Sequence, residues 1–172
     1  DGTFRYKNTT EDIEEAVWQQ AIELSFMSHV RLIKAALPAL RQSETPSVLT
    51  VTSVSVKQPI PNLVLSNSIR AATVGLTKSL ALELGNEQIR FNSILPGWTK
   101  TERVVELMDD RARHHQSSIQ EEMEQQTSDI PLGRMARPEE FARAAVFLLS
   151  PAASYITGVM LPVEGGAYRG TL

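Results

Sequence analysis

The fold is decided by two apolar stretches, Val48-Leu49-Thr50-Val51-Thr52-Ser53 and Ile89-Arg90-Phe91-Asn92-Ser93-Ile94-Leu95-Pro96-Gly97. Between them, residues 63–85 follow a helical pattern with apolar side chains on more than one side. A strand, a helix and a second strand in this order predict parallel crossover connections and therefore an α/β layer fold. We expect strands at 47–54, 89–95 and 158–164.

Helical periodicity also marks a segment near each end of the chain. Apolar residues recur at helical spacing from Ile13 to about residue 41, after a helix start expected at Thr9 and Thr10. Pro138 begins an amphipathic helix at 137–149, and Gly85 suits the C-terminal cap of the helix before it. No repeat or linker interrupts the chain, so residues 1–172 are expected to form a single domain.

Composition restricts the class of protein. The 172 residues are enough for one sizeable core, and a net charge of −3 without a Lys/Arg cluster argues against a nucleic-acid partner or an anionic membrane surface. No apolar run is long enough to span a membrane. The absence of cysteine excludes disulfides, thiolate catalysis and Cys-ligated zinc, and it fits a cytoplasmic location.

Residues 99–128 are polar and charged, and they leave directly from the end of a predicted strand. They are interpreted as a solvated helical excursion, with a lid over a binding site as the alternative. The adjacent His114 and His115 belong to it, and at most one of them can point inward. His29 has no partner at metal-ligand spacing, so it is interpreted as structural, and no metal site is expected.

Several motifs occur in an order that resembles the short-chain dehydrogenase/reductase (SDR) superfamily, nearest to its β-ketoacyl-carrier-protein reductase-like group. The resemblance covers roughly residues 10–168. It implies a Rossmann-like doubly wound parallel sheet. Its motifs are Ser53, the pair Ser66 and Arg70 thirteen residues later, Pro96-Gly97, Ile130-Pro131-Leu132-Gly133-Arg134, Arg137-Pro138-Glu139-Glu140, Ala153-Ser154-Tyr155-Ile156-Thr157-Gly158 and Val163-Glu164-Gly165-Gly166.

One half of the family's pattern has no counterpart in this sequence. Members carry an N-terminal βαβ half with a Gly-rich dinucleotide loop and an Asn-Asn-Ala-Gly turn, and none of the nine glycines here forms such a loop. We therefore expect the chain to be the C-terminal part of a longer one, with the N-terminal dinucleotide-binding half absent. The remaining sheet should then have a bare edge.

The resemblance implies a catalytic tetrad of Asn, Ser, Tyr and Lys, of which only the serine, Ser53, is retained. Ser25 stands at the asparagine position, Ser66 at the tyrosine position and Arg70 at the lysine position. The family's phenol donates a proton while its lysine lowers the phenol's pKa and holds the nicotinamide ribose. A serine hydroxyl is a much weaker acid than a phenol, and the serine side chain is shorter than that of tyrosine. The alternative is that these residues are only structural. The Ser53 hydroxyl would then form hydrogen bonds with nearby backbone groups, and Ser66 and Arg70 would be ordinary helix residues.

The implied cofactor is NAD or NADP, without a choice between them, because the residues that read the ribose lie in the half that has no counterpart. By resemblance, Arg70 could hold ribose or phosphate, and Pro96-Gly97 would pass beside the nicotinamide. Thr99 would contact the carboxamide, and Thr101 would lie near the pyrophosphate. Trp98 could crowd or cover the ring.

Three functions remain open at this point. The first is an NAD(P)-dependent oxidoreductase acting on a small carbonyl or alcohol substrate, whose proton comes from water held by Ser53 and Ser66 or from His114 or His115. The second is an inactive relative that binds a ligand or serves as a structural module. The third is another reaction, such as dehydration or epimerisation, on the same fold. A homodimer or homotetramer is expected through the helix at 66–84.

Overall fold

The computed structural model describes residues 10–171, so the expectation for Thr9 lies outside the described residues. Three parallel strands form one sheet in the order β1-β2-β3, in which Thr50 pairs with Ser93 and Ser93 with Met160. The α/β class and the parallel connections are confirmed. The strands are β1 (Ser47–Val51), β2 (Arg90–Pro96) and β3 (Met160–Val163).

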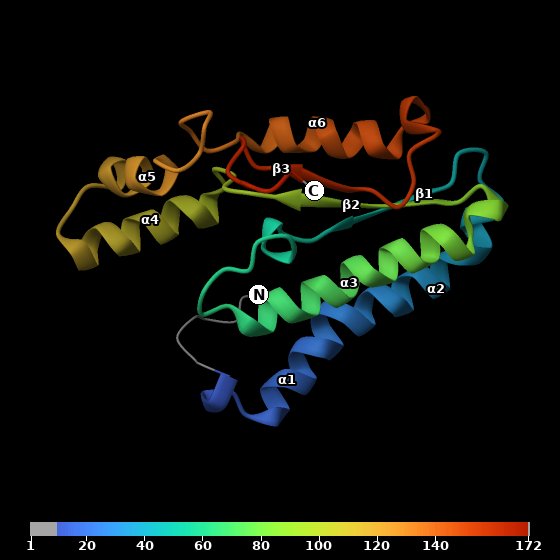
Figure 1. The fold of residues 1–172 in the computed structure, drawn as a ribbon, viewed down its shortest axis with the longest axis horizontal. Coiled ribbons are helices and arrows are strands. Elements are labelled where there is room, and N and C mark those ends of the chain that lie inside the picture. The colour runs from blue at the N-terminus through green and yellow to red at the C-terminus, as the bar shows by residue number, and fades with distance from the viewer. Residues whose placement is uncertain (1–9, 172) are drawn as a thin grey trace.

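Helices cover both faces of this sheet, as a doubly wound fold requires. Helices α2 (Ser28–Leu40) and α3 (Val64–Glu83) lie on one face, and α6 (Pro138–Leu149) lies on the other (Figure 1). Within residues 10–171, β1 pairs only with β2, so its other edge is open, and Val51 is half exposed there. This is the bare edge expected from the sequence.

The first long helix differs from the continuous one predicted. A 3₁₀ turn, η1 (Thr10–Asp12), comes first, and α1 (Glu15–Ile22) begins after Glu14, whose side chain makes no capping hydrogen bond. A helical turn therefore starts at Thr10 as expected, but it is a 3₁₀ turn, and the α-helix itself begins only at Glu15. A π-helical turn, η2 (Glu23–Met27), then separates α1 from α2. Hydrophobic periodicity tolerates the one extra residue of a π turn, so the pattern did not reveal it.

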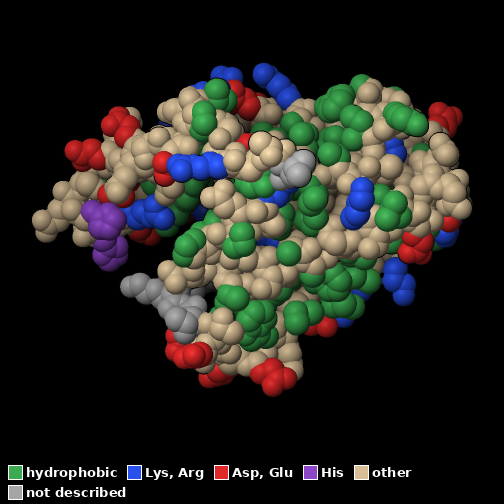
Figure 2. Space-filling model, viewed as in Figure 1, with side chains coloured by type: hydrophobic (Ala, Val, Ile, Leu, Met, Phe, Trp, Pro, Cys, Tyr) green, Lys and Arg blue, Asp and Glu red, His purple; other side chains and the backbone are tan. Residues whose placement is uncertain are grey.

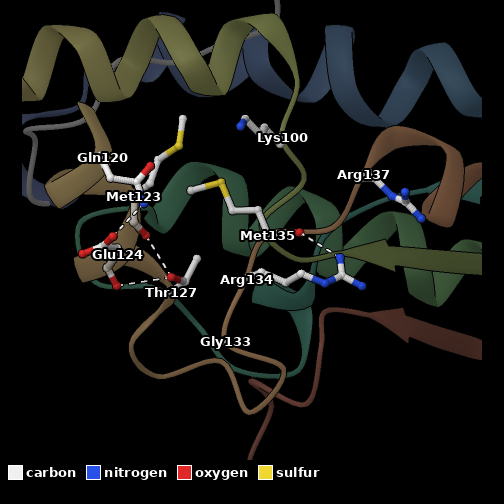
Figure 3. A pocket seen from close by; sticks show the side chains of 9 residues that line it. All are labelled: Lys100, Gln120, Met123, Glu124, Thr127, Gly133, Arg134, Met135 and Arg137. Atoms are coloured by element: carbon white, nitrogen blue, oxygen red, sulfur yellow. Dashed lines mark hydrogen bonds between the residues drawn. The ribbon is translucent and has the colours of Figure 1, made fainter. Parts of the chain in front are cut away.

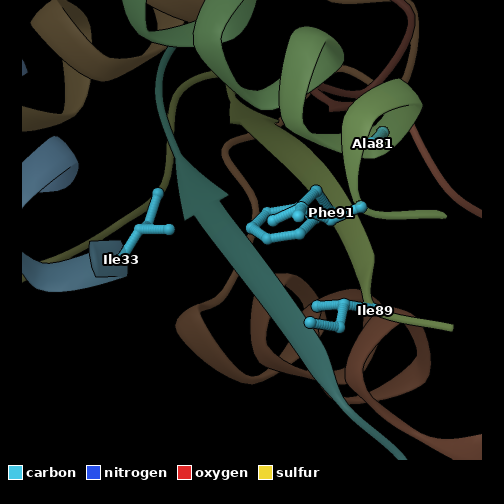
Figure 4. Close-up of a cluster of buried hydrophobic side chains, with 5 residues drawn as sticks. Ile33, Ala81, Ile89 and Phe91 are labelled. Carbon is cyan, nitrogen blue, oxygen red and sulfur yellow. The ribbon is translucent and has the colours of Figure 1, made fainter. Parts of the chain in front are cut away.

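The core lies where α2 and α3 meet the first half of β2. Ile89 and Phe91 are completely buried, and they pack with Ile33, Ala81 and Leu84 (Figure 4). Leu84, not Gly85, caps α3, and Gly85 begins the 3₁₀ turn η4 (Gly85–Glu87). The predicted glycine cap is wrong because the left-handed backbone needed to turn the chain occurs later, at Gln88.

Arg90 is the charged residue of this core, only 8 % exposed. Its guanidinium donates to three carbonyl oxygens at the C-terminal end of α6, those of Leu148, Leu149 and Ser150, at 2.6, 3.1 and 3.2 Å. Since the last carbonyls of a helix lack partners and carry partial negative charge, a buried cation there is satisfied. The chain leaves α6 through the 3₁₀ turn η5 (Pro151–Ala153) and reaches β3.

The excursion after β2 is helical, as expected. It consists of α4 (Glu102–His115) and α5 (Ile119–Thr127). Figure 2 shows histidine side chains at its tip, where α4 ends and the chain turns into α5. Ser118 and Glu121 begin α5 with a reciprocal capping box. Among the residues the structure describes, no helix is long and apolar enough to cross a membrane.

Candidate active site

The carboxyl ends of β1 and β2 meet at one edge of the sheet, where ligands bind in open parallel sheets. Strand β1 ends at Val51, earlier than the predicted residue 54, because the chain turns at Ser53 into a 3₁₀ turn, η3 (Val54–Val56). Strand β2 ends at Pro96, followed by Gly97. Ser53 and the Pro96-Gly97 turn therefore lie at the same edge, as the sequence predicted.

Ser53 is held by its own turn. Its Oγ accepts a hydrogen bond from the backbone N–H of Ser55 at 3.1 Å, as an N-cap residue does. A serine hydroxyl has one proton to donate, and the N–H of Ser55 occupies an acceptor site, not that proton. Half-buried Ser53 can therefore satisfy local backbone and still donate to a ligand oxygen.

Arg70 links Ser66 to the end of β1. Its Nε donates to Ser66 Oγ at 3.0 Å, and its Nη1 donates to the carbonyl oxygen of Thr52 at 2.9 Å. Ser66 and Arg70 lie one turn apart on α3, which explains the first contact. Thr52 directly precedes Ser53, so the three sequence-predicted residues Ser53, Ser66 and Arg70 are brought together.

Ser25 lies in the π-helical turn, on the side of α3. Its carbonyl oxygen accepts a hydrogen bond from Thr73 Oγ1 at 3.1 Å. π turns inside α-helices are frequent at functional sites because they displace one residue from the regular backbone. The link goes through the backbone of Ser25, and no hydrogen bond joins its hydroxyl to Ser53 or Ser66.

The turn after β2 is held by close backbone contacts. A Cβ on Gly97 would lie 2.5 Å from Glu164 Cβ, so only glycine fits without a shift. Thr99 pairs with Ala136 in a parallel bridge, and its Oγ1 lies 3.5 Å from the Gly97 carbonyl. Thr101 caps α4 through a 3.4 Å bond from Val104 N–H.

Trp98 is partly covered by the excursion, because the guanidinium of Arg111 lies 5.9 Å from its ring centre. Its carbonyl accepts the N–H of Ala136 at 2.9 Å, which fixes its backbone beside the segment leading into α6. The side chain is half-buried at the end of β2.

The histidines lie outside this cluster. His115 is exposed, and its Nδ1 lies 2.9 Å from Glu122 Oε1 on α5. Ser117 also donates to that oxygen, at 2.6 Å, and these two contacts, the serine first, hold the pKa of Glu122 below its ordinary value. His29 Nδ1 lies 3.5 Å from Ser28 Oγ. Within residues 10–171, no group of acids and histidines is arranged to hold a metal.

Two features near this edge were missed by sequence reasoning. Lys57 follows η3, and its Nζ lies 5.2 Å from the ring centre of Tyr168, far away in the sequence. The hydroxyls of Thr52, Ser55 and Ser93 are buried, and within residues 10–171 they have no hydrogen-bond partner. No local pattern marks either feature, because both depend on segments that meet only in the folded chain.

Comparison with known proteins decides the family. The model of the family described as enoyl-(acyl carrier protein) reductase matches residues 2–168. The chain belongs to the short-chain dehydrogenase/reductase superfamily. The resemblance in the motifs and the Rossmann-like fold are therefore confirmed.

Other members of the SDR superfamily resemble the chain at moderate identity. Dehydrogenase/reductase SDR family member 4 of Oryctolagus cuniculus is 35% identical over 156 residues, which are 91% of this chain and 56% of the relative. The 7alpha-hydroxysteroid dehydrogenase of Escherichia coli is 32% identical over 158 residues, 92% of this chain and 58% of the relative. The chain thus spans little more than half the length of these relatives.

Solved SDR structures superpose well on the fold. L-sorbose reductase from Gluconobacter frateurii, complexed with NADPH and L-sorbose, gives a TM-score of 0.90 at 27% identity, over 97% of this chain and 64% of that one. An NADPH-bound short chain oxidoreductase from Pseudomonas aeruginosa, described as containing an atypical catalytic center, gives 0.80 at 29% identity, over 99% and 64%.

Proposed function

We propose that the chain provides the substrate-facing part of an NAD(P)-dependent oxidoreductase that reduces a small carbonyl compound, or oxidises the corresponding alcohol, by an altered proton path. The supporting observation is the cluster at the end of β1, in which Arg70 binds Ser66 Oγ and the Thr52 carbonyl beside Ser53. Membership of a family of oxidoreductases supports the reaction class.

The residues present fit one end of the dinucleotide. The glycine turn at Gly97 packs closely against Glu164, and Thr99 and Thr101 follow it at the sheet edge. Arg70 spends two of its N–H groups on Ser66 and Thr52, and the others can bind ribose hydroxyls. Residues 1–172 contain no Gly-rich phosphate loop, so they do not fit the pyrophosphate end.

When bound, the nicotinamide supplies or accepts the hydride. The Ser53 hydroxyl would donate a hydrogen bond to the substrate carbonyl oxygen and keep its proton. That oxygen becomes negatively charged during reduction, so the hydrogen bond stabilises it. The positive charge of the Arg70 guanidinium favours that negative charge.

The proton itself comes from water in this proposal. Ser66 Oγ accepts from Arg70, so its own hydroxyl proton points to another partner, and with Ser53 it can hold a water beside the substrate oxygen. That water gives its proton to the alkoxide, and the hydroxide is returned to solvent. The alternative of a histidine donor has less support, because His115 is turned to Glu122.

The test is dinucleotide binding and turnover, measured separately. Binding is followed by energy transfer from tryptophan to NADPH or NADH, and turnover by the loss of reduced dinucleotide with a panel of carbonyl compounds. We expect Ser53→Ala to lower turnover by about a hundredfold without changing dinucleotide affinity, since one hydrogen-bond donor to the oxyanion is lost. Ser154→Ala, at an exposed serine that caps the end of η5, is the matched control and should change neither quantity.

A second candidate is a non-catalytic binding module, and the loss of the family's phenol and lysine favours it. Binding of dinucleotide with no turnover on the panel would support this module. Ser66→Tyr combined with Arg70→Lys separates the two further. If the chain has merely lost its acid, turnover should appear or rise. Unchanged turnover in a variant that binds dinucleotide would contradict the idea that the acid alone is missing.

We also propose self-association through α3. Its outward face carries small residues, Lys78 and one large apolar side chain, Leu82, which is 76 % exposed. Small residues allow another helix to approach closely, and an exposed leucine near the C-terminal end of the same face favours a covered surface. The face comprises Ser68, Ala71, Ala72, Gly75, Lys78, Ser79 and Leu82.

A further inference from the structure

A cavity of about 550 Å³ lies between α5 and the segment 133–137 that leads into α6, and the proposed reaction does not use it (Figure 3). Three cations line it: Lys100 from the segment after β2, and Arg134 and Arg137 from the segment before α6. Met123 and Met135 provide the apolar part of the wall. The cavity therefore combines positive charge with flexible apolar surface.

The backbone holds Lys100 at the wall of the cavity. Thr99 pairs with Ala136 in a parallel bridge, and Lys100 N–H donates to the Ala136 carbonyl at 2.8 Å. In Figure 3 the Lys100 ammonium points toward Met123, whereas the Arg137 guanidinium points the other way. Lys100 is therefore the cation that faces the methionine side of the cavity.

Among the described residues, a single carboxylate, that of Glu140, forms ion pairs with the three cations. Glu140 receives two 2.8 Å hydrogen bonds from Arg134, and its Oε2 also lies 3.6 Å from Arg137 Nε. One carboxylate thus serves both arginines. In the part of the chain that the structure describes, Lys100 makes no ion pair, although its side chain reaches the cavity.

The other acid of the wall lies across the cavity. Glu124 accepts a hydrogen bond from Gln120 at 2.6 Å, along α5. Figure 3 shows Glu124 on one side and Arg137 on the other, with Met123 and Met135 between them. A ligand in the cavity would meet cations at one end and methionine side chains along its length.

We propose that this cavity binds a small amphipathic organic acid. Its carboxylate lies against the Lys100 ammonium, and its apolar part lies against Met123 and Met135. A carboxylate supplies Lys100 with a counter-charge and accepts charge-assisted hydrogen bonds from it. The unbranched, polarizable methionine side chains adapt to apolar groups of different shape.

The first experiment is calorimetric titration of the full chain with octanoate, with octanol and inorganic phosphate as comparison probes and no dinucleotide present. We expect saturable octanoate binding that weakens as salt is raised, and clearly weaker binding of both comparison probes. Equal affinity for octanol would overturn the role of the cations, equal affinity for phosphate would overturn the apolar part, and no octanoate binding at millimolar concentration would overturn the site.

Variants then assign the binding to Lys100. Lys100→Gln should weaken octanoate binding about tenfold, the loss expected for one charge-assisted hydrogen bond. Lys34→Gln, an exposed lysine on α2, should leave the affinity unchanged. Because Lys100 is exposed, its variant should keep the wild-type Tm, so a loss of binding is not a loss of fold. Equal binding by Lys100→Gln and wild type would overturn the proposal.

Methionine signals place the ligand independently of affinity. In a chain labelled with methyl-¹³C methionine, the five methyl resonances can be followed during titration. Those of Met123 and Met135 should move with octanoate, whereas those of Met27 and Met160, outside the cavity, should not. Movement of Met27 or Met160 without Met123 and Met135 would overturn the placement.

Discussion

Arg70 and Thr52 are joined by a 2.9 Å hydrogen bond from Nη1 to the carbonyl oxygen, and this bond fastens α3 to the end of β1. The same guanidinium holds Ser66 Oγ at 3.0 Å. Arg70→Ala removes both contacts, so we expect a loss of about 1–2 kcal/mol in the free energy of unfolding, measured by urea denaturation. Arg70→Lys should lose less, because an ammonium can replace one of the two contacts.

Arg31→Ala is the control for this loss. Arg31 pairs with Glu23 at 2.7 Å, but both side chains are more than half exposed, so the change should stay within about 0.5 kcal/mol. If Arg31→Ala and Arg70→Ala cost the same, the link between α3 and β1 is not what stabilises the site.

Gly97→Ala is expected to be destabilising by about 1–3 kcal/mol, because the added methyl group would meet Glu164 Cβ at 2.5 Å and Glu164 Cα at 2.8 Å. The Gly97 N–H also donates to the Val163 carbonyl, so the turn cannot move without loosening its contact with β3. Gly85→Ala is the matched control, since a Cβ there meets nothing within 4 Å. Urea denaturation of the two variants measures the difference in their free energy of unfolding. Equal stability would show that the turn can shift to accommodate the added methyl group at little cost.

Acid should weaken the contact between Glu140 and Arg134. The hydrogen bonds from Arg134, with a smaller contribution from the Arg137 N–H, lower the pKa of Glu140 from 4.5 to about 2. A carboxyl group with a lowered pKa stabilises the folded state above its ordinary pKa, and the stabilisation is lost as the pH falls toward the folded value. We therefore expect wild type to have a higher Tm than Glu140→Gln at pH 7, and the gap to close between pH 4.5 and about 2.

Glu139→Gln controls for the charge change itself. Glu139 lies beside Glu140 in the first turn of α6, but it makes no ion pair within residues 10–171. Its Tm difference from wild type should be smaller at pH 7. A gap for Glu140→Gln that stays constant down to pH 2 would contradict the pairing.

The elements that the sequence predicted well are those with local signals. The apolar strand stretches, the spacing of Ser66 and Arg70 on one helix face, and the glycine turn at Gly97 are short-range patterns, and the structure brings them to one edge of the sheet. The capping box of Ser118 and Glu121 has such a signal too, although the sequence analysis did not use it.

The features that were missed depend on contacts between distant segments. The π turn Glu23–Met27 differs from an α-helix by one residue, which periodicity cannot resolve. Arg90 reaches the carbonyls that end α6, and Lys100 lines the cavity only because the segments after β2 and before α6 pair. Both residues look like ordinary surface cations in the sequence.

Leu82→Arg should prevent the proposed self-association. The side chain is 76 % exposed on α3, so arginine can be accommodated in the monomer, but a charge placed in an apolar interface between two helices loses its water without gaining a partner. Light scattering coupled to chromatography at micromolar concentration should give a dimer or tetramer for wild type and a monomer for the variant. Leu32→Arg, at a leucine 70 % exposed on α2, should stay associated, because the proposed face does not include it. A monomeric wild type would refute the interface, and loss of association in both variants would move it away from α3.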